Sequence, residues 1–316
     1  MKYIIIVVLF LTSLYGQKLI EPRYVYNISG MVTDLFYNTN FLYVATDDGQ
    51  VECFNVKTKK LEHNIQLKKI KDFMGDAVGS KIFSLDMIED KLMILSQDSG
   101  GYSRVHIYQD KQLEQVISKD DMLNIIKAKF IDKDTLILAL ISNDIISYNI
   151  KTKKKNWVTQ ASMSKFSSFA LNNDRTLVAI ADESGDVHLL SIKDGHIVKK
   201  LSGQNVDNIF SIAFCGHIVL TGGQDRRAGV YDITRGSAYH KASSFFVYGV
   251  GLSPSGKIGA YSSDLKNNIT LFSTQTREKL GVYKSNKAIV NGIYFISENE
   301  FFVNSNAKTV SYYKVK

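Results

Sequence analysis

An aromatic or leucine anchor recurs along this chain at an almost constant spacing. The seven anchors are Phe54, Tyr108, Tyr148, Leu190, Tyr231, Phe272 and Tyr313. The intervals between them are 54, 40, 42, 41, 41 and 41 residues. A period near 40 residues with four strand signals per repeat is typical of a β-propeller blade. The sequence therefore predicts an all-β fold, a seven-bladed β-propeller with four-stranded blades.

The predicted blades follow one another without a gap large enough for a second domain. They span residues 32–67, 81–118, 122–160, 165–202, 208–242, 245–283 and 288–316. The last of these contains only three strands. Residues 23–28, where Tyr24, Tyr26 and Ile28 alternate with Val25 and Asn27, are expected to supply the fourth strand and close the ring. We therefore expect residues 17–316 to form a single propeller domain.

The first 16 residues have the features of a bacterial secretory signal. Lys2 provides a positive start, residues 3–14 are mostly apolar, and Gly16 is a small residue suited to the position before a cleavage site. The apolar run is too short for a comfortable membrane span, although an uncleaved anchor is the alternative. We expect residues 1–16 to be a signal peptide and the mature protein to be periplasmic, without a stable membrane anchor.

The formal net charge of the chain is +8 at pH 7. A basic excess suggests nucleic-acid binding in an intracellular protein, but an exported protein rarely meets nucleic acid. The lysine-rich segments 57–60 and 151–155 fall at predicted turns and edges, where charge keeps sheets from associating. We therefore predict no nucleic-acid partner, and an acidic partner surface remains the alternative explanation.

The two cysteines, Cys53 and Cys215, fall in the first and fifth predicted blades. These blades lie across the ring from each other, so the two Cα atoms are expected to be too far apart for a disulfide. The sequence predicts two free and mostly buried thiols.

Four charged residues fall at predicted channel-facing positions of the innermost strands. They are Asp34, Asp86, Lys127 and Lys129, from three consecutive blades. Unpaired buried charges are costly, so we expect these acids and bases to form structural ion pairs. A small polar-ligand site at the mouth of the channel is the alternative.

Residues 68–80 form an insertion between the first two blades and account for the one long interval. The segment contains Lys71, Asp72, Phe73 and Met74. Long loops in compact domains tend to be functional or disordered, and apolar side chains on an exposed loop suggest a partner contact. We predict that this loop binds a partner; a loop folded back over the ring is the alternative.

The turns between second and third strands lie on the same face as this insertion. They are rich in Asp, Asn and Gly, which suit tight hairpins. On this face, the segment 182–186 with Asp182 and Glu183, and the basic pair Arg226 and Arg227, are further candidate partner contacts. For the two arginines, a salt bridge between blades is the alternative.

The sequence contains no recognisable catalytic or cofactor motif. The six histidines are spread over four blades without the spacing of metal ligands, and there is no nucleophile elbow, P-loop or dinucleotide fingerprint. We therefore expect no enzymatic activity, no metal and no cofactor, and we expect a monomeric protein-interaction scaffold.

Several segments resemble WD repeats. Residues 201–214 resemble the start of such a repeat, and residues 221–225 followed by 230–233 resemble its end, with Tyr231 in place of the family's Trp. The Gly-His pair of the family is missing, and the Trp-Asp pair occurs nowhere.

The N-terminal signal and the segments 222–232 and 249–256 are similar to a narrower group. These are the periplasmic L accessory proteins encoded beside the periplasmic nitrate reductase in ε-proteobacterial gene clusters. The resemblance implies an accessory factor of the nitrate reductase system, whose partner is a reductase subunit or a maturation factor.

A second resemblance implies a different function. Residues 149–157, which end at Trp157, resemble the Asp-x-x-Thr-Gly-x-x-x-Trp docking motif of quinoprotein-type propellers. That group includes the outer-membrane assembly scaffold lipoprotein. A quinoprotein-like or outer-membrane-assembly propeller is therefore the alternative function, and a hydrolase or lyase with a site in the channel is a third.

Overall fold

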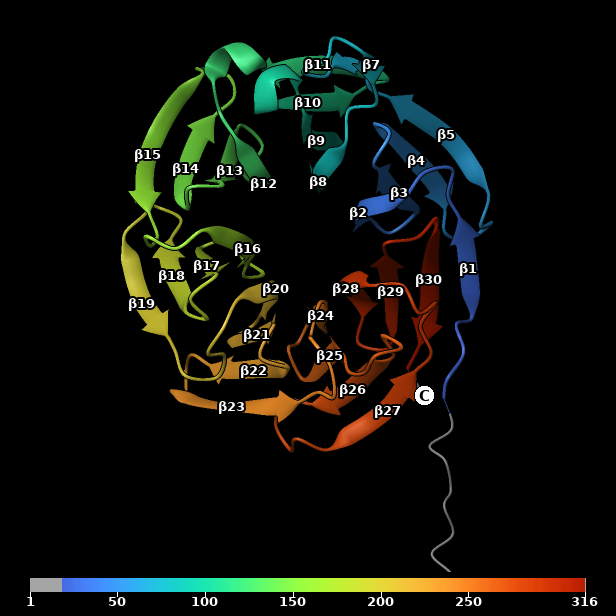
Figure 1. Cartoon of the computed structure of the whole chain (residues 1–316), viewed down its shortest axis with the longest axis vertical. Coiled ribbons are helices and arrows are strands. Elements are labelled where there is room, and N and C mark those ends of the chain that lie inside the picture. The colour runs from blue at the N-terminus through green and yellow to red at the C-terminus, as the bar shows by residue number, and fades with distance from the viewer. Residues whose placement is uncertain (1–18, 316) are drawn as a thin grey trace, which may run out of the picture.

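The computed structural model describes residues 19–315, so the predicted signal peptide at residues 1–16 lies outside the described residues. Seven four-stranded antiparallel sheets are arranged around a central axis, with the first strand of each sheet innermost (Figure 1). The only helical elements among the described residues are two 3-10 turns, η1 (Ser99–Gly101) and η2 (Lys119–Asp121). The predicted seven-bladed propeller is confirmed.

The first three blades follow the chain from the inside of the ring outward. Blade one contains β2 (Val32–Tyr37), β3 (Phe41–Thr46), β4 (Gln50–Asn55) and β5 (Leu61–Gln66). Blade two contains β8 (Ile82–Ile88), β9 (Lys91–Gln97), β10 (Ser103–Gln109) and β11 (Gln112–Ile117). Blade three contains β12 (Ile125–Asp132), β13 (Thr135–Leu140), β14 (Asp144–Asn149) and β15 (Lys154–Gln160).

The next three blades repeat this arrangement. Blade four contains β16 (Phe166–Leu171), β17 (Leu177–Asp182), β18 (Val187–Ser191) and β19 (Ile197–Leu201). Blade five contains β20 (Ile209–Cys215), β21 (Ile218–Gly223), β22 (Arg227–Asp232) and β23 (Ser237–Ala242). Blade six contains β24 (Val250–Leu252), β25 (Ile258–Ser262), β26 (Ile269–Ser273) and β27 (Lys279–Tyr283).

Blade seven joins the two ends of the described chain. It contains β28 (Val290–Ser297), β29 (Glu300–Ser305), β30 (Thr309–Lys314) and, as its outer strand, β1 (Tyr24–Asn27). Figure 1 shows β1 lying beside β30, and the two pair antiparallel with Tyr26 opposite Val310. Just upstream, the Ile20 amide donates to the Val282 carbonyl at 2.9 Å. The predicted closure of the ring by the N-terminal strand is confirmed, and the preceding residues also bind blade six.

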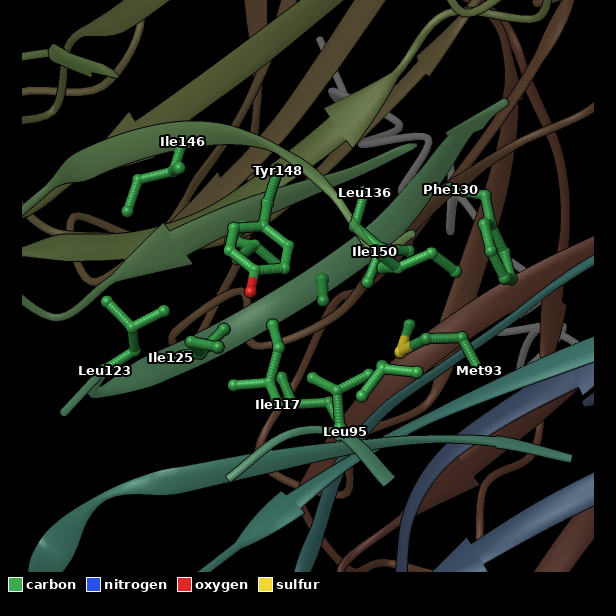
Figure 2. Packing of buried hydrophobic residues seen from close by; sticks show 14 of the residues in the cluster. Met93, Leu95, Ile117, Leu123, Ile125, Phe130, Leu136, Ile146, Tyr148 and Ile150 are labelled. Atoms are coloured by element: carbon green, nitrogen blue, oxygen red, sulfur yellow. The ribbon is translucent and has the colours of Figure 1, made fainter. Parts of the chain in front are cut away.

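The core lies between neighbouring blades rather than inside any one of them. Each sheet is sandwiched between two others, so both faces of its middle strands are apolar; β13, for example, reads Thr-Leu-Ile-Leu-Ala-Leu. Figure 2 shows the layer between blades two and three, where Met93 and Leu95 meet Leu136 and Tyr148. Tyr148 is one of the seven periodic anchors, and all seven occupy the third strand of a blade. The recurring anchor is therefore a core position.

Trp157 on the outer strand β15 also joins two blades. Its indole N–H donates to the Ile192 carbonyl of blade four at 3.0 Å. Gly195 lies against this ring, and a Cβ on Gly195 would be 2.5 Å from Trp157 Cε3. The segment that resembles a docking motif thus contributes to packing between blades three and four.

The polar turns are stabilised by hydrogen bonds within each blade. In blade five, Thr221 Oγ1 donates to Asn205 Oδ1 at 2.6 Å, and Asn205 Nδ2 donates to Asp225 Oδ1 at 3.0 Å. This network fixes the connection into the blade against the turn between its second and third strands.

Both cysteines are free thiols, as predicted. Cys53 on β4 is buried, and Cys215 on β20 is partly buried. Burial raises the pKa of each thiol to about 11, so both are protonated at neutral pH.

Candidate functional site

The two faces of the ring carry different parts of the chain. One face, which we call the loop face, carries the connections between blades and the turns between second and third strands. The opposite face carries the turns between first and second strands and between third and fourth strands. This division follows from the antiparallel order within every sheet, and it allows each candidate residue to be assigned to a face.

Exposed apolar side chains gather on the loop face. Phe73 is 95% exposed and Met163 is 91% exposed, although each belongs to a connection next to well-packed strands. We call the exposed apolar residues of the inter-blade connections the apolar crown: Met31, Phe73, Met74, Met122, Met163, Val206 and Ile289. They come from six of the seven connections. The turns of the opposite face, within the described chain, expose no large hydrophobic side chain.

The seventh connection, between blades five and six, carries an aromatic cluster. Phe245 stacks on Phe246 with ring centroids 4.9 Å apart, and Tyr248 stacks on Phe210 with centroids 5.1 Å apart. All four rings are partly exposed. Every connection between blades therefore presents apolar surface on the loop face.

The insertion predicted to bind a partner is a small hairpin on the loop face. Its two-residue strands, β6 (Ile70–Lys71) and β7 (Ala77–Val78), pair with each other. Asp72 shapes the tip, since its carboxylate accepts the amides of Met74 and Asp76 at 2.9 Å. Phe73 and Met74 point to solvent and Lys71 is exposed, so the tip matches the expectation of an exposed loop.

The base of the hairpin, in contrast, is packed against the ring. Ile70 is buried, and the Ser80 hydroxyl donates to the Gln97 carbonyl at 2.6 Å. The Arg104 guanidinium donates to the Lys68 carbonyl. The base of the segment 68–80 is therefore held in place, and its tip projects from the ring.

A hollow lies on the loop face over blades seven, one, two and three, next to this base. Its volume is about 710 Å³. Its lining includes Met31, Asp47, Gly79, Phe83 and Ile126. Met31 of the apolar crown thus borders a recess large enough to receive a protruding segment of a partner.

The turn residues predicted as partner contacts have different environments. Asp182 is fully buried, and its carboxylate accepts hydrogen bonds from the Ser162 hydroxyl at 2.6 Å and the Ser184 amide at 2.9 Å. The prediction that Asp182 contacts a partner is therefore wrong. Glu183 is exposed and pairs with Lys165 at 3.3 Å.

The two arginines on the turn of blade five also differ in their exposure to solvent. Arg226 is exposed, whereas Arg227 is partly buried. The Arg227 guanidinium lies 3.9 Å from the Asp225 carboxylate of its own turn, so its ion pair is formed within the blade and not between blades. Arg226 is the residue of the pair that faces outward.

The four predicted channel charges do line one cavity, which opens toward the opposite face. Its volume is about 430 Å³, and Asp34, Asp86, Lys127 and Lys129 all border it. However, the expected ion pairs among them are not formed. Asp86 instead pairs with Arg175 at 3.0 Å, whereas Asp34 accepts from the Leu85 amide at 2.8 Å and the Tyr294 hydroxyl at 2.7 Å.

The two lysines of this cavity bind neutral oxygens. Lys127 Nζ donates to the Ser168 hydroxyl at 3.1 Å, and Lys129 Nζ donates to the Leu85 carbonyl at 2.5 Å. Backbone and hydroxyl acceptors of neighbouring blades thus take the place of the expected carboxylates, because the two acids are already held by other donors.

Sequence reasoning missed most of the apolar crown and also Arg175. The crown has a signal in the sequence, since Met31, Met74, Met122 and Met163 are 43, 48 and 41 residues apart, close to the blade period. Arg175 has no comparable signal, because it lies on a turn and is 89 positions from its partner Asp86.

No group of three His, Cys, Asp or Glu side chains within residues 19–315 is arranged to hold a metal ion. Likewise, no helix in this part of the chain has the length and apolar character needed to cross a bilayer.

A comparison with protein-family models finds no match, and neither does a comparison with curated proteins. The fold is similar to that of a chain in the crystal structure of a mitotic checkpoint complex, with a TM-score of 0.77. The two sequences are 13% identical, and the match covers 100% of this chain and 98% of that one. This similarity concerns the fold alone.

Proposed function

We propose that this chain is a non-catalytic scaffold that binds a protein partner on its loop face. The observation that carries the proposal is the asymmetry between the two faces of the ring. Every connection on the loop face presents apolar surface, whereas the turns of the opposite face within residues 19–315 expose no large hydrophobic side chain. Exposed apolar patches mark sites of protein interaction, and methionine adapts well to a partner surface.

The way the crown is held supports this function. Each connection is fixed at both ends by strands of packed sheets, so the apolar side chains are presented on a rigid frame. Little ordering entropy is lost when such a preorganised surface binds. The similar chain in the mitotic checkpoint complex is itself part of a protein assembly, which agrees with a scaffold.

We further propose that the protein works in the periplasm as an accessory factor of the periplasmic nitrate reductase system. The apolar N-terminal run and the similarity of the segments 222–232 and 249–256 to the L accessory proteins support this assignment. The turn of the first segment, which carries Arg226, lies on the loop face next to the proposed docking surface.

Affinity capture from nitrate-grown cells, followed by quantitative mass spectrometry, tests both levels of the proposal. A variant with Phe73→Ser, Met122→Ser and Met163→Ser removes an exposed crown side chain from each of three connections. The matched control carries Val158→Ser and Val198→Ser, which are exposed on the outer strands β15 and β19. We expect nitrate reductase components with the unmodified protein and the control, and about tenfold less with the crown variant, since hot-spot losses are of this order.

Two results would contradict the proposal at different levels. Equal capture by the crown variant would move the docking surface elsewhere. If capture depends on the crown but recovers outer-membrane assembly proteins, the scaffold function would stand and the nitrate reductase assignment would be wrong. Release of the protein by selective extraction of the periplasm tests the proposed location independently.

A further inference from the structure

The cavity of about 430 Å³ that opens toward the opposite face has an unusual balance of charge. Three cations border it, Lys127, Lys129 and Arg175, against two carboxylates, Asp34 and Asp86. Its volume lies within the range of pockets that bind small molecules. The partners of these charged groups decide which of them can bind a ligand.

Both carboxylates are already bound to donors. Asp86 accepts from Arg175 at 3.0 Å and from the Phe130 amide at 2.8 Å. Asp34 accepts from the Leu85 amide and the Tyr294 hydroxyl. These contacts fix the two acids to neighbouring blades and pair the charge of Arg175 with that of Asp86.

The two ammonium groups are in a different situation. Lys127 and Lys129 are two positions apart on β12, so both side chains point to the same side of the strand. Within residues 19–315 neither forms an ion pair with a carboxylate, and each binds a single neutral oxygen at 3.1 Å and 2.5 Å respectively. An ammonium group can donate three hydrogen bonds, so both retain donors for an anion placed between them.

The rest of the lining combines polar side chains, such as Asn172 and Asn173, with an apolar surface. Phe36, Leu171 and Ile296, from blades one, four and seven, are partly exposed and border the same cavity. An inorganic oxyanion would leave this surface uncovered, whereas an organic acid would cover it with its hydrocarbon part.

We propose that this cavity binds a small organic acid, whose carboxylate is held between Lys127 and Lys129 and whose apolar part packs on Phe36, Leu171 and Ile296. The site is on the face opposite the apolar crown, so it is separate from the docking surface proposed above. A negative result for ligand binding would leave the docking proposal unaffected.

The charges around Lys127 make ligand binding dependent on pH. Burial and the adjacent Lys129 lower the pKa of Lys127 to about 8, and Asp34 only partly opposes this shift. The other charged or titratable groups of the cavity are Asp86, Arg175, Tyr37 and Tyr294. Burial and Asp34 raise the pKa of Tyr294 well above its ordinary value, so it stays neutral. A bound carboxylate favours the charged form of Lys127, so affinity should fall as the pH rises through about 8.

Isothermal titration calorimetry with benzoate tests the site, with benzyl alcohol and sulfate as comparison ligands. We expect benzoate to bind at pH 7 and to bind much more weakly at pH 9.5, and we expect benzyl alcohol and sulfate to bind far less than benzoate. Lys127→Met and Lys129→Met should each weaken benzoate about tenfold to a hundredfold, as expected for the loss of a charged hydrogen bond. Lys133→Met, at an exposed lysine outside the cavity, is the matched control.

The variant Lys127→Arg keeps the positive charge at all accessible pH values, because an arginine guanidinium is not deprotonated in proteins. It should retain benzoate binding and lose most of the pH dependence, which a merely structural role of Lys127 would not predict. Binding of benzoate that is unaffected by both methionine variants, or absent at pH 7, would overturn the proposal. Sulfate binding as tightly as benzoate would overturn the assignment to an organic acid.

Discussion

The guanidinium of Arg175 lies 3.0 Å from the carboxylate of Asp86 although the two residues belong to blades four and two. Arg175 reaches across blade three, where it also donates to the Phe130 carbonyl. It has a positive φ of 55° on the turn after β16. One side chain thus links three consecutive blades on the opposite face.

We expect this ion pair to stabilise the ring. Arg175→Met should lower the free energy of unfolding by about 3 kcal/mol, because it leaves the buried Asp86 carboxylate without its cation. Urea unfolding of Arg175→Met, Asp86→Asn and the double variant gives the coupling between the two residues. Lys165→Met, which removes the exposed pair with Glu183, is the control and should cost less than about 1 kcal/mol. Additive effects of the two cavity variants would contradict a direct coupling.

Closure of the ring by β1 makes a second prediction. Tyr26 is buried between blades seven and one, with its ring centroid 5.3 Å from that of Phe54. Tyr26→Ala should destabilise the protein by about 3–5 kcal/mol, as for other large aromatic side chains in cores. The neighbouring Val25 points outward, so Val25→Ala should change stability by less than about 1 kcal/mol. Similar melting temperatures for the two variants would show that β1 does not close the ring.

Stability should also depend on pH through His106. Burial, with a smaller effect of Arg104, lowers the pKa of His106 from its ordinary value of 6.5 to about 4. The unfolded chain therefore binds the proton first as the pH falls. The free energy of unfolding that depends on neutral His106 is fully present above about pH 6.5 and declines between pH 6.5 and pH 4. The full loss is about 3 kcal/mol, from 1.36 kcal/mol per pKa unit.

Urea unfolding between pH 7 and pH 4 measures this loss, and His106→Gln should reduce the slope. A part of the slope should remain, because burial also lowers the pKa of His188. An unchanged slope in His106→Gln would exclude His106 as the cause.

The insertion hairpin allows binding and stability to be separated. Replacing only its tip, with Phe73→Ser and Met74→Ser, should leave the free energy of unfolding within about 0.5 kcal/mol, since both side chains are exposed. Deleting residues 68–80 should instead destabilise the ring, because Ile70 is buried and the Lys68 carbonyl accepts from Arg104. Thermal unfolding compares the two variants, and a destabilised tip variant would contradict this division.

The sequence determines the fold well because the same constraint is repeated seven times. An anchor such as Tyr231 or Tyr313 must fill the space between two sheets, so the interval between successive anchors gives the length of a blade. The closure of the ring was predictable as well, because blade seven lacked a strand and Tyr24, Tyr26 and Ile28 alternate in an N-terminal segment. The channel positions of Lys127 and Lys129 were predicted for the same reason, since side chains alternate along a strand.

The contacts made by side chains on turns were harder to predict. Asp86 was expected to pair with a lysine of the channel, but Arg175 reaches it from a turn whose left-handed backbone has no clear sequence signal. Asp182 has the same polar character as exposed turn residues, yet its hydrogen bonds to Ser162 and Ser184 bury it. The apolar crown is formed by single residues of separate loops, which come together only when the ring places them on one face.

Site-specific photo-crosslinking in living cells tests the central claim most directly, because it reports which face meets the partner. The crosslinking amino acid is placed at Met163 on the loop face, or at Glu89 on the turn between β8 and β9 of the opposite face; both positions are exposed. The account predicts a discrete crosslink to a partner protein from position 163 and none from position 89. A crosslink to that protein from position 89 alone would contradict it.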